Sequence, residues 1–299
     1  MVALGPHASV ERVIDIDPFR LPLDFLFPDA QLGTLATARG WLAPHHVDFD
    51  RAEVLLGVQS HLLRIGGRVI LIDSCVGEHK HRPNRADWHM RADTGYLARL
   101  AAHGVTPADV DVVFCTHLHA DHVGWNTRLE DGRWVPTFPN ARYLVGRTEL
   151  AHWQTHAAAN HGAFTDSVAP LLEAGCVDVV DDGADLGGKM QLAPARLDAT
   201  DLSGHSPGQL GLVVQGGGTR AIFCGDAIHN PAQLVRPDWT SQFCHDRALA
   251  ARTRRQLLQD ASDTGSYIIP AHLRHAMAFR PLPRHDNGHD TWQPLWLQD

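Results

Sequence analysis

Residues 115–125 read CTHLHADHVGW, which places three histidines and an aspartate within six positions. In an extended segment, side chains two residues apart point to the same side, so His117 and His119 can hold one ion. The chain must then turn, and Asp121 and His122 face a second position beside the first. This spacing predicts a metal site at the point where a strand ends.

The chemistry of these side chains indicates which metals fit. Imidazole and carboxylate groups suit zinc, and also manganese, iron or cobalt. Two ions with few protein ligands leave room for a bridging hydroxide. Zinc lowers the pKa of bound water to about 7, so such a hydroxide is available at neutral pH. The alternative is an exposed histidine-rich loop with adventitious metal affinity. A lone HxH favours that loop, whereas HxHxDH after a strand favours a built site.

Several apolar segments end in the same kind of residue. The segment LID ends at Asp73, VVFCTH at His117, FCGD at Asp226 and IIPAH at His272. Each residue alone is more typical of a cap or a turn. Together they indicate an α/β scaffold, in which buried strands deliver polar side chains to one crevice.

Strand-like and helix-like patterns alternate along the chain. We expect a hairpin over 53–74 that turns at Gly66 and Gly67, a helix over 93–105, and a strand over 109–117. Later segments predict strands over 190–198, 210–215, 220–226 and 266–272, and an amphipathic helix over 246–262. Residues 18–50 lack clear periodicity. We therefore expect one domain over 1–299, with an irregular N-terminal arm over about 1–50, a core over about 51–275 and a short tail over 276–299.

Composition excludes several classes of protein. The 299 residues are 44% hydrophobic and 20% charged, which favours a folded chain over a disordered one. The formal charge of -8 gives no basic field for nucleic acid or anionic lipid. No apolar run approaches the ~20 residues of a membrane span. The five cysteines lack a CxxC pair and the N-terminus lacks a signal-peptide pattern, so a cytoplasmic location is expected.

At this point the sequence resembles a known family. THLHADHVG looks like the signature of the metallo-β-lactamase superfamily, and the superfamily's later motifs follow in order as SGHSPGQ, FCGDAIH and IIPAH. The resemblance implies an α/β fold, an αββα sandwich of two mixed β-sheets flanked by helices. It also implies two divalent metal ions, with Zn²⁺ favoured and Mn, Fe or Co as alternatives.

The resemblance carries ligand roles onto matching positions. The first metal would be held by three histidines, the second by three other residues, and a bridging aspartate would bind both: His117, His119 and His205; Asp121, His122 and His272; and Asp226. Asp73, in LIDSCVG, matches a residue that supports ligands without binding metal.

Branches of the superfamily are separated by single residues. Flavodiiron oxidoreductases have Glu where this chain has His119, and zinc β-lactamases with a cysteine ligand lack the bridging aspartate that Asp226 supplies. Glyoxalase-II-like thioesterases append a helical domain, but only 27 residues follow His272. Nuclease branches call for a basic surface. The lactonase-like group remains, and VGWNTR, WVPTFPNARYLV and GDAIHNPAQL look closest to the methyl-parathion-hydrolase-like enzymes.

Two rival functions are weaker. GHSPG at 204–208 matches the G-x-S-x-G elbow of serine esterases, but the following QLGLVVQ alternates like a strand where the elbow needs a helix. A non-catalytic metal-binding module is the second rival. A structural zinc site is usually closed by four ligands, whereas seven ligands for two ions leave open positions.

We therefore expect hydrolysis of a small, uncharged carboxylic ester or lactone by a metal-bridging hydroxide, with phosphotriester hydrolysis on the same site as the alternative. Asp121, Asp226 and His229 are the expected catalytic residues. His229 stands where lactonases carry a tyrosine, three residues after the bridging aspartate. A protonated His229 would donate to a leaving alkoxide, and a purely structural histidine is the other interpretation.

The substrate pocket and the partners are the least specified features. Trp88, Trp125 and Phe243 are candidates to line the pocket, as are the apolar residues Leu23, Phe25, Leu26 and Phe27 in the arm. No nucleic acid or membrane partner is expected. A second copy of the chain is a candidate partner, through the arm or through Trp292 and Trp296.

Overall fold

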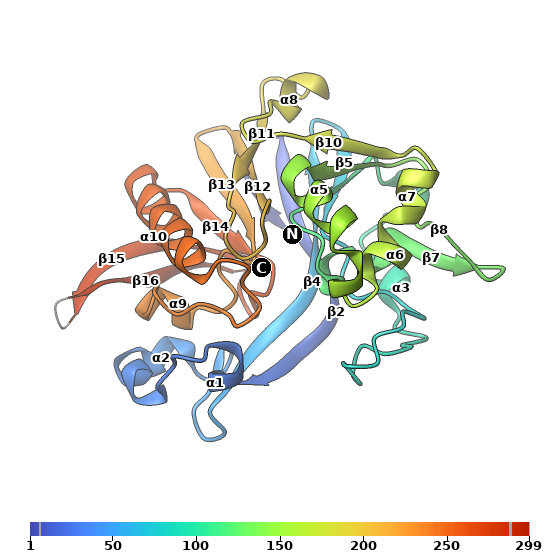
Figure 1. The fold of residues 1–299 in the computed structure, drawn as a ribbon. Coiled ribbons are helices and arrows are strands. Elements are labelled where there is room, and N and C mark those ends of the chain that lie inside the picture. The colour runs from blue at the N-terminus through green and yellow to red at the C-terminus, as the bar shows by residue number, and fades with distance from the viewer. Residues whose placement is uncertain (6, 287–288, 299) are drawn as a thin grey trace.

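The computed structural model describes residues 1–5, 7–286 and 289–298. Two mixed sheets lie at its centre (Figure 1). The strands of the first sheet are, in spatial order, β1 (Val2–Ala3), β2 (Ala8–Pro22), β4 (Glu53–Ile65), β5 (Arg68–Ile72), β6 (Val112–Cys115), β9 (Arg142–Gly146) and β10 (Val177–Val180), with β3 (Val47–Asp48) paired to β4. The strands from β5 to β10 run parallel, and the others are antiparallel.

The second sheet runs in sequence order. Its strands are β11 (Arg196–Asp201), β12 (Leu210–Gly216), β13 (Thr219–Gly225), β14 (Tyr267–Pro270), β15 (Ala278–Asp286) and β16 (His289–Leu297). Only β13 and β14 are parallel within it. A separate hairpin joins β7 (Thr127–Glu130) to β8 (Arg133–Pro136).

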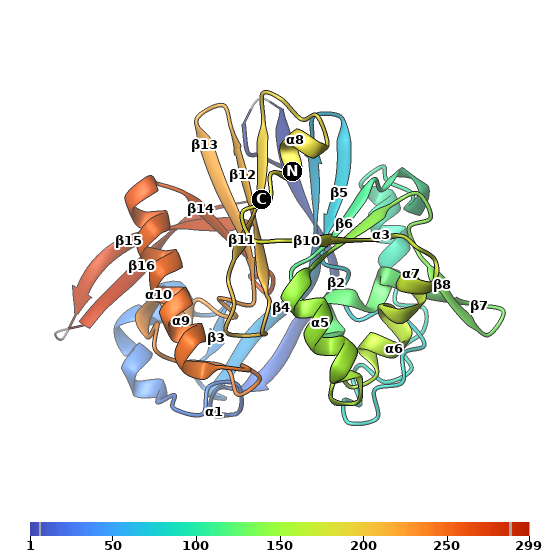
Figure 2. The same cartoon turned by 45° about the horizontal axis from the view of Figure 1, so that its top comes forward.

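Helices cover the outer faces of both sheets. The α-helices are α1 (Leu23–Leu26), α2 (Arg39–Leu42), α3 (Tyr96–Ala102), α4 (Ala120–Val123), α5 (Arg147–Thr155), α6 (Ala163–Ser167), α7 (Ala169–Glu173), α8 (Leu186–Lys189), α9 (Ala232–Val235) and α10 (Arg247–Thr264). Four 3₁₀ turns are η1 (Leu32–Ala38), η2 (Pro107–Asp109), η3 (Gly124–Asn126) and η4 (Ala157–Ala159). Figure 2 shows α9 and α10 on one side and α3, α5, α6 and α7 on the other, with the sheets between them.

Three hydrophobic clusters hold these layers together. One lies between the sheets and combines Leu63 and Phe114 of the first with Phe223 of the second. Another packs the outer face of the first sheet, including Leu62, against α3 and α5–α7. The third packs the second sheet against α10. Successive residues Leu62 and Leu63 face opposite clusters because side chains alternate along a strand. The expected αββα sandwich is confirmed.

Most of the predicted elements are present. The hairpin over 53–74 is β4 and β5, the helix over 93–105 is α3, and the helix over 246–262 is α10. The strand expected over 190–198 is partly wrong, because β11 begins only at Arg196. The described residues contain no helix with both the length and the apolar character to cross a bilayer.

The expectation of an irregular N-terminal arm is wrong for residues 8–22. Residues 8–22 form β2, which pairs with β4 along nearly its whole length. The pairing shifts register between Ile14 and Ile16 and again between Ile16 and Phe19. Such bulges interrupt the alternation of buried and exposed side chains, which is why periodicity did not reveal the strand.

The expectation of a short tail over 276–299 is also wrong for the described residues. Residues 287, 288 and 299 lie outside the described part. The tail forms β15 and β16, in which Pro281 pairs with Pro294. Prolines in a run argue against a strand, so the hairpin was not expected. Trp292 is buried, and the Trp296 ring packs on Trp41 and His46. Trp292 is therefore not at the surface, Trp296 is half-buried, and dimer formation stays a prediction.

Candidate metal centre

The polar side chains that end buried strands lie at one end of the two sheets. Asp73 directly follows β5, and His117 lies two residues beyond the parallel strand β6. Asp226 directly follows β13, and His272 lies two residues beyond the parallel strand β14. Each pair of parallel strands therefore brings two of these residues to the same edge. The loop before β12 adds His205 from a further segment.

The turn after β6 depends on a glycine. His119 precedes α4, whose single turn carries Asp121 and His122. The chain then passes so close to the loop after Asp73 that a Cβ on Gly124 would stand 1.9 Å from the Val76 carbonyl oxygen. No other residue fits this crossing. Gly124 thus lets the HxHxDH turn lie directly against the end of β5.

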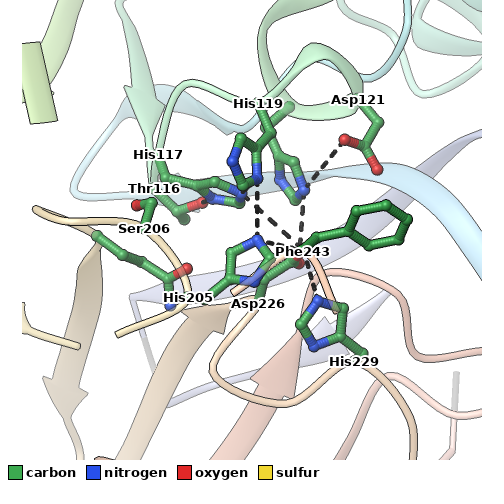
Figure 3. Close-up of polar contacts among 12 residues, drawn as sticks. Thr116, His117, His119, Asp121, His205, Ser206, Asp226, His229 and Phe243 are labelled. Carbon is green, nitrogen blue, oxygen red and sulfur yellow. Dashed lines mark hydrogen bonds and ion pairs between the residues drawn. The ribbon is translucent and has the colours of Figure 1, made fainter. Parts of the chain in front are cut away.

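Three imidazoles converge on one point of the site (Figure 3). Nδ1 of His119 lies 3.1 Å from Nε2 of His117 and 2.9 Å from Nε2 of His205. Oδ2 of Asp226 lies 3.3 Å from the same His205 nitrogen. These four side chains lie close enough together to be the candidate ligands of one metal ion, the first group that the resemblance implies.

A second group lies on the other side of Asp226. Oδ1 of Asp226 is 3.1 Å from Nε2 of His272 and 3.4 Å from Nε2 of His122. Asp121 completes the group, with its oxygens 3.7 Å from His272 and 3.8 Å from His122. Asp226 therefore turns one oxygen toward each group, which is the arrangement expected of a bridging carboxylate.

Partners behind the ligands orient the rings. Nδ1 of His122 donates to Oδ2 of Asp73 at 2.8 Å, and Nδ1 of His272 donates to the Gly57 carbonyl at 2.8 Å. Thr116 donates its backbone N–H and its hydroxyl to the two oxygens of Asp73, both at 2.8 Å, and its Oγ1 lies 3.0 Å from Nδ1 of His117. With Nδ1 protonated, His122 and His272 turn bare Nε2 lone pairs toward carboxylates.

This arrangement fits metal ions better than protons. Nε2 of His122 and Oδ1 of Asp226 are buried acceptors without a hydrogen-bond partner among the described residues. Such orphaned acceptors are costly unless a cation lies between them. Burial lowers the pKa of His117 and of His205, which keeps those rings in the neutral, metal-binding form.

The second group shows the same demand for positive charge. Burial opposes a charge on His122, yet the carboxylates of Asp226, Asp121 and Asp73 outweigh it and raise the pKa of His122 well above its usual value. Burial also opposes a charge on His272, but Asp226 outweighs it, so the pKa of His272 is raised as well. A cation bound between these acids and imidazoles would satisfy them without protonating a ring.

His229 also lies in the centre. Its Nε2 is 3.2 Å from Oδ2 of Asp226, and neither ring nitrogen has a hydrogen-bond partner among the described residues. The backbone N–H of His229 donates to Oε1 of Gln233 at 2.8 Å, which fixes the loop. Burial lowers the pKa of His229, although Asp226 opposes this. The lowered pKa favours a neutral ring over the protonated donor, which was one of the two interpretations expected from the sequence.

The three candidate pocket residues separate in the structure. Trp88 and Trp125 are buried in the core cluster outside the first sheet, where Trp88 packs on Phe19 and Trp125 stacks on Tyr96. Phe243 is 44% exposed and lies beside the site in Figure 3. We therefore retain Phe243 alone of the three as a pocket residue.

The N-terminal residues divide in a similar way. Leu23, Leu26 and Phe27 are buried, and the Phe27 ring stands edge-on to His229 with 6.4 Å between centroids. Phe25 is 45% exposed, and its ring lies 6.0 Å from that of Phe243. These two rings form an exposed aromatic pair, and Cys244, which follows Phe243, has its Sγ 3.6 Å from Nδ1 of His205.

The serine-esterase interpretation is wrong. Ser206 is fully buried, and its hydroxyl donates to Oε2 of Glu149 at 2.7 Å. The chain after it enters β12 instead of a helix. A nucleophile at a strained, exposed elbow is therefore not formed.

Sequence reasoning also missed two residues that support the site. Glu149 accepts hydrogen bonds from both histidine-bearing loops. The buried guanidinium of Arg254 donates to three carbonyls of the loop after β13, those of Ala227, Pro237 and Trp239. Neither residue belongs to a local motif, so no signal in the sequence marked them.

The sequence is similar to a family model and to individual known proteins. Residues 54–272 match the family model of the Metallo-beta-lactamase superfamily. N-acyl homoserine lactonase AttM of Azorhizobium caulinodans is 33% identical over 191 residues, which are 61% of this chain and 65% of AttM, slightly under two thirds of its length. Ribonuclease Z of Mycobacterium avium is 37% identical over only 79 residues, 26% of this chain and 22% of that enzyme.

Solved structures share the fold along the whole chain. AbOPH, a hydrolase in the beta lactamase superfamily, superposes with a TM-score of 0.76 at 22% identity, covering 99% of this chain and 97% of AbOPH. AidC, a dizinc quorum-quenching lactonase, gives a TM-score of 0.72 at 18% identity, covering 100% and 97%. At these identities the similarity shows the fold.

Proposed function

The chain belongs to the metallo-beta-lactamase superfamily, and on that premise we propose that it is a dinuclear metal-dependent hydrolase of the lactonase-like branch. Its substrate would be a small, uncharged carboxylic ester or lactone. One observation carries the proposal. Asp226 stands between two groups of imidazole and carboxylate ligands and turns one oxygen toward each.

The donor set supports two divalent ions, with zinc the favoured identity. His117, His119 and His205 would hold the first ion, and Asp121, His122 and His272 the second. When bound, the two ions would supply a hydroxide nucleophile at neutral pH and polarise a carbonyl oxygen. Asp226 would set the distance between the two metal positions. The carboxylate of Asp121 would balance part of the positive charge of the second ion.

His229 would act on the substrate as a neutral ring. Neither ring nitrogen has a hydrogen-bond partner among the described residues, so an N–H of the ring would be available to a substrate oxygen. A neutral imidazole placed in this way stabilises negative charge that develops on the oxygen. This role is an alternative to the cationic proton donor and to the structural histidine expected from the sequence.

The surroundings of the site favour an uncharged substrate with an apolar portion. Phe25 and Phe243 form an exposed aromatic pair, of which Phe243 lies beside the ligand residues in Figure 3. The formal charge of -8 disfavours polyanions such as RNA, despite the short match to ribonuclease Z. AttM and AidC are named as lactonases, and lactones are therefore the first substrates to test.

The deciding experiment is a substrate panel. Metal-replete protein would be assayed on aryl esters, N-acyl homoserine lactones, a phosphotriester and RNA, and each assay would be repeated after a chelator has removed the metal. We expect ester or lactone turnover that disappears with the metal. Turnover of the phosphotriester alone would favour the alternative substrate, and turnover of RNA alone would contradict the proposed branch.

The same panel tests the non-catalytic alternative. Protein that holds two ions per chain and hydrolyses none of the panel would be a binding module. The cytoplasmic location and the homodimer expected from the sequence stay predictions. Five free thiols are consistent with a reducing compartment.

A further inference from the structure

One buried carboxylate connects the two loops that carry the first ligand group. Glu149 lies in the first turn of α5 and is 1% exposed. Its Oε1 accepts from the backbone N–H of Leu118 at 3.0 Å and from Nε1 of Trp153 at 2.7 Å. Its Oε2 accepts from the Ser206 hydroxyl at 2.7 Å and the Gly208 N–H at 3.0 Å. All four donors are uncharged.

The positions of these donors give the carboxylate its significance. Leu118 stands between His117 and His119, and Ser206 directly follows His205. The Trp153 indole packs edge-on against His119, with 5.7 Å between ring centroids. Every imidazole of the first group is thus one residue or one ring away from a hydrogen bond to Glu149.

The surrounding backbone leaves little room for adjustment. A Cβ on Gly208 would stand 2.3 Å from the Glu149 backbone nitrogen, so the loop after His205 lies directly on α5. The Leu118 carbonyl is held from its other side by Nδ2 of Asn160 at 3.0 Å. Both loops are therefore fixed relative to α5, and Glu149 is the side chain that joins them.

We propose that Glu149 is a positioning residue that assembles the first metal position selectively. The inference rests on the proposed function, because it assumes that His117, His119 and His205 bind metal. The second group is backed by different partners, Asp73 and the Gly57 carbonyl. Removing the Glu149 contacts should therefore weaken one metal position and spare the other.

The substitution Glu149→Gln tests this with almost no change of shape. An ionised carboxylate offers acceptor sites to all four donors, whereas an amide turns two N–H groups toward donors on one side. Either orientation of the amide separates at least one loop from α5. Partners behind metal ligands typically change metal affinity by about 10–100-fold when removed, and this is the loss that we expect.

Two backgrounds isolate the two positions. His272→Ala removes a ligand of the second group only, and His119→Ala removes a ligand of the first group only. Zn²⁺ affinity would be measured by competition with a chromophoric chelator, with bound metal counted by elemental analysis. Glu149→Gln should lower the affinity about 10–100-fold in the His272→Ala background. In the His119→Ala background the affinity should not change. Glu173→Gln, at an exposed position on α7, is the matched control and should change neither.

Several results would overturn the inference or the proposed function. No loss in the His272→Ala background, or an equal loss in both backgrounds, would overturn the selective role, the second result indicating a general loosening of the fold. If Glu149→Gln does not fold, Ser206→Ala and Trp153→Phe each remove one donor and should weaken the same position by a smaller factor. If neither changes Zn²⁺ affinity, the inference fails. A wild-type chain without bound metal would instead overturn the proposed function itself.

Discussion

Asp73→Asn is the substitution that separates the orientation of a ligand from its presence. Asp73 is buried and receives three hydrogen bonds, two from Thr116 and one from Nδ1 of His122. Its backbone φ is +56°, a region that asparagine adopts readily. The substitution therefore keeps the shape and the backbone and changes one oxygen to an amide nitrogen.

The consequence depends on which way the amide turns. With Nδ2 toward the Thr116 backbone, a buried N–H loses its acceptor. With Nδ2 toward His122, Nδ1 of that ring must accept, and its proton moves to Nε2, the atom 3.4 Å from Asp226. Both outcomes oppose metal binding. We expect a loss of affinity of about 10–100-fold, which is about 1.4–2.7 kcal/mol.

The assay is a competition titration of metal-free protein with Zn²⁺ and a chromophoric chelator. The control is Asp131→Asn, because Asp131 is exposed in the β7–β8 turn and has a similar φ of +48°. It should bind Zn²⁺ as the wild type does. If Asp73→Asn binds two ions with affinities within about twofold of the wild type, Asp73 does not set the tautomer of His122, and the reasoning from its hydrogen bonds is wrong.

Three further substitutions test other parts of the site. Asp226→Ala should reduce bound metal below two ions per chain and abolish hydrolysis while the circular dichroism spectrum is retained, and an active, metal-free variant would contradict the whole assignment. His229→Phe should lower turnover about 10²-fold with metal content unchanged, whereas wild-type turnover would make His229 structural. Gly124→Ala places a Cβ against the Val76 carbonyl and should lower the free energy of unfolding by roughly 1–3 kcal/mol in urea, and an unchanged midpoint would show that the crossing can open.

The parts of the fold that could be predicted are those with a local signal. The β4–β5 hairpin alternates cleanly and turns at two glycines, and the ligand-bearing strand ends were visible because each apolar run stops at a histidine or an aspartate. β2 escaped prediction because its two register shifts break the period, and β15 and β16 because prolines interrupt them. In these strands the pairing with neighbours outweighs the local pattern.

The support of the site was harder to predict than the ligands. Glu149 sits on a helix with no motif, and it matters only because folding brings Leu118 and Gly208 to it. Trp88 and Trp125 show the opposite error, since their nearness in sequence to the motifs does not place them at the site. Contacts between distant segments decide both cases, and a single sequence does not display them.

The distribution of the proposed ligands along the chain has a consequence for how the protein folds in the presence of metal. His117, His119, Asp121 and His122 lie within six residues, whereas His205, Asp226 and His272 join them only when the two sheets pack. An unfolded chain therefore retains four of the seven proposed ligands within one short segment. Metal bound to that segment would stabilise the unfolded chain and would offset part of the stability that metal adds to the native state. Refolding in excess Zn²⁺, followed by tryptophan fluorescence, should accordingly be slower than refolding without metal and adding Zn²⁺ afterwards, and equal rates would show that the short segment does not hold the ion.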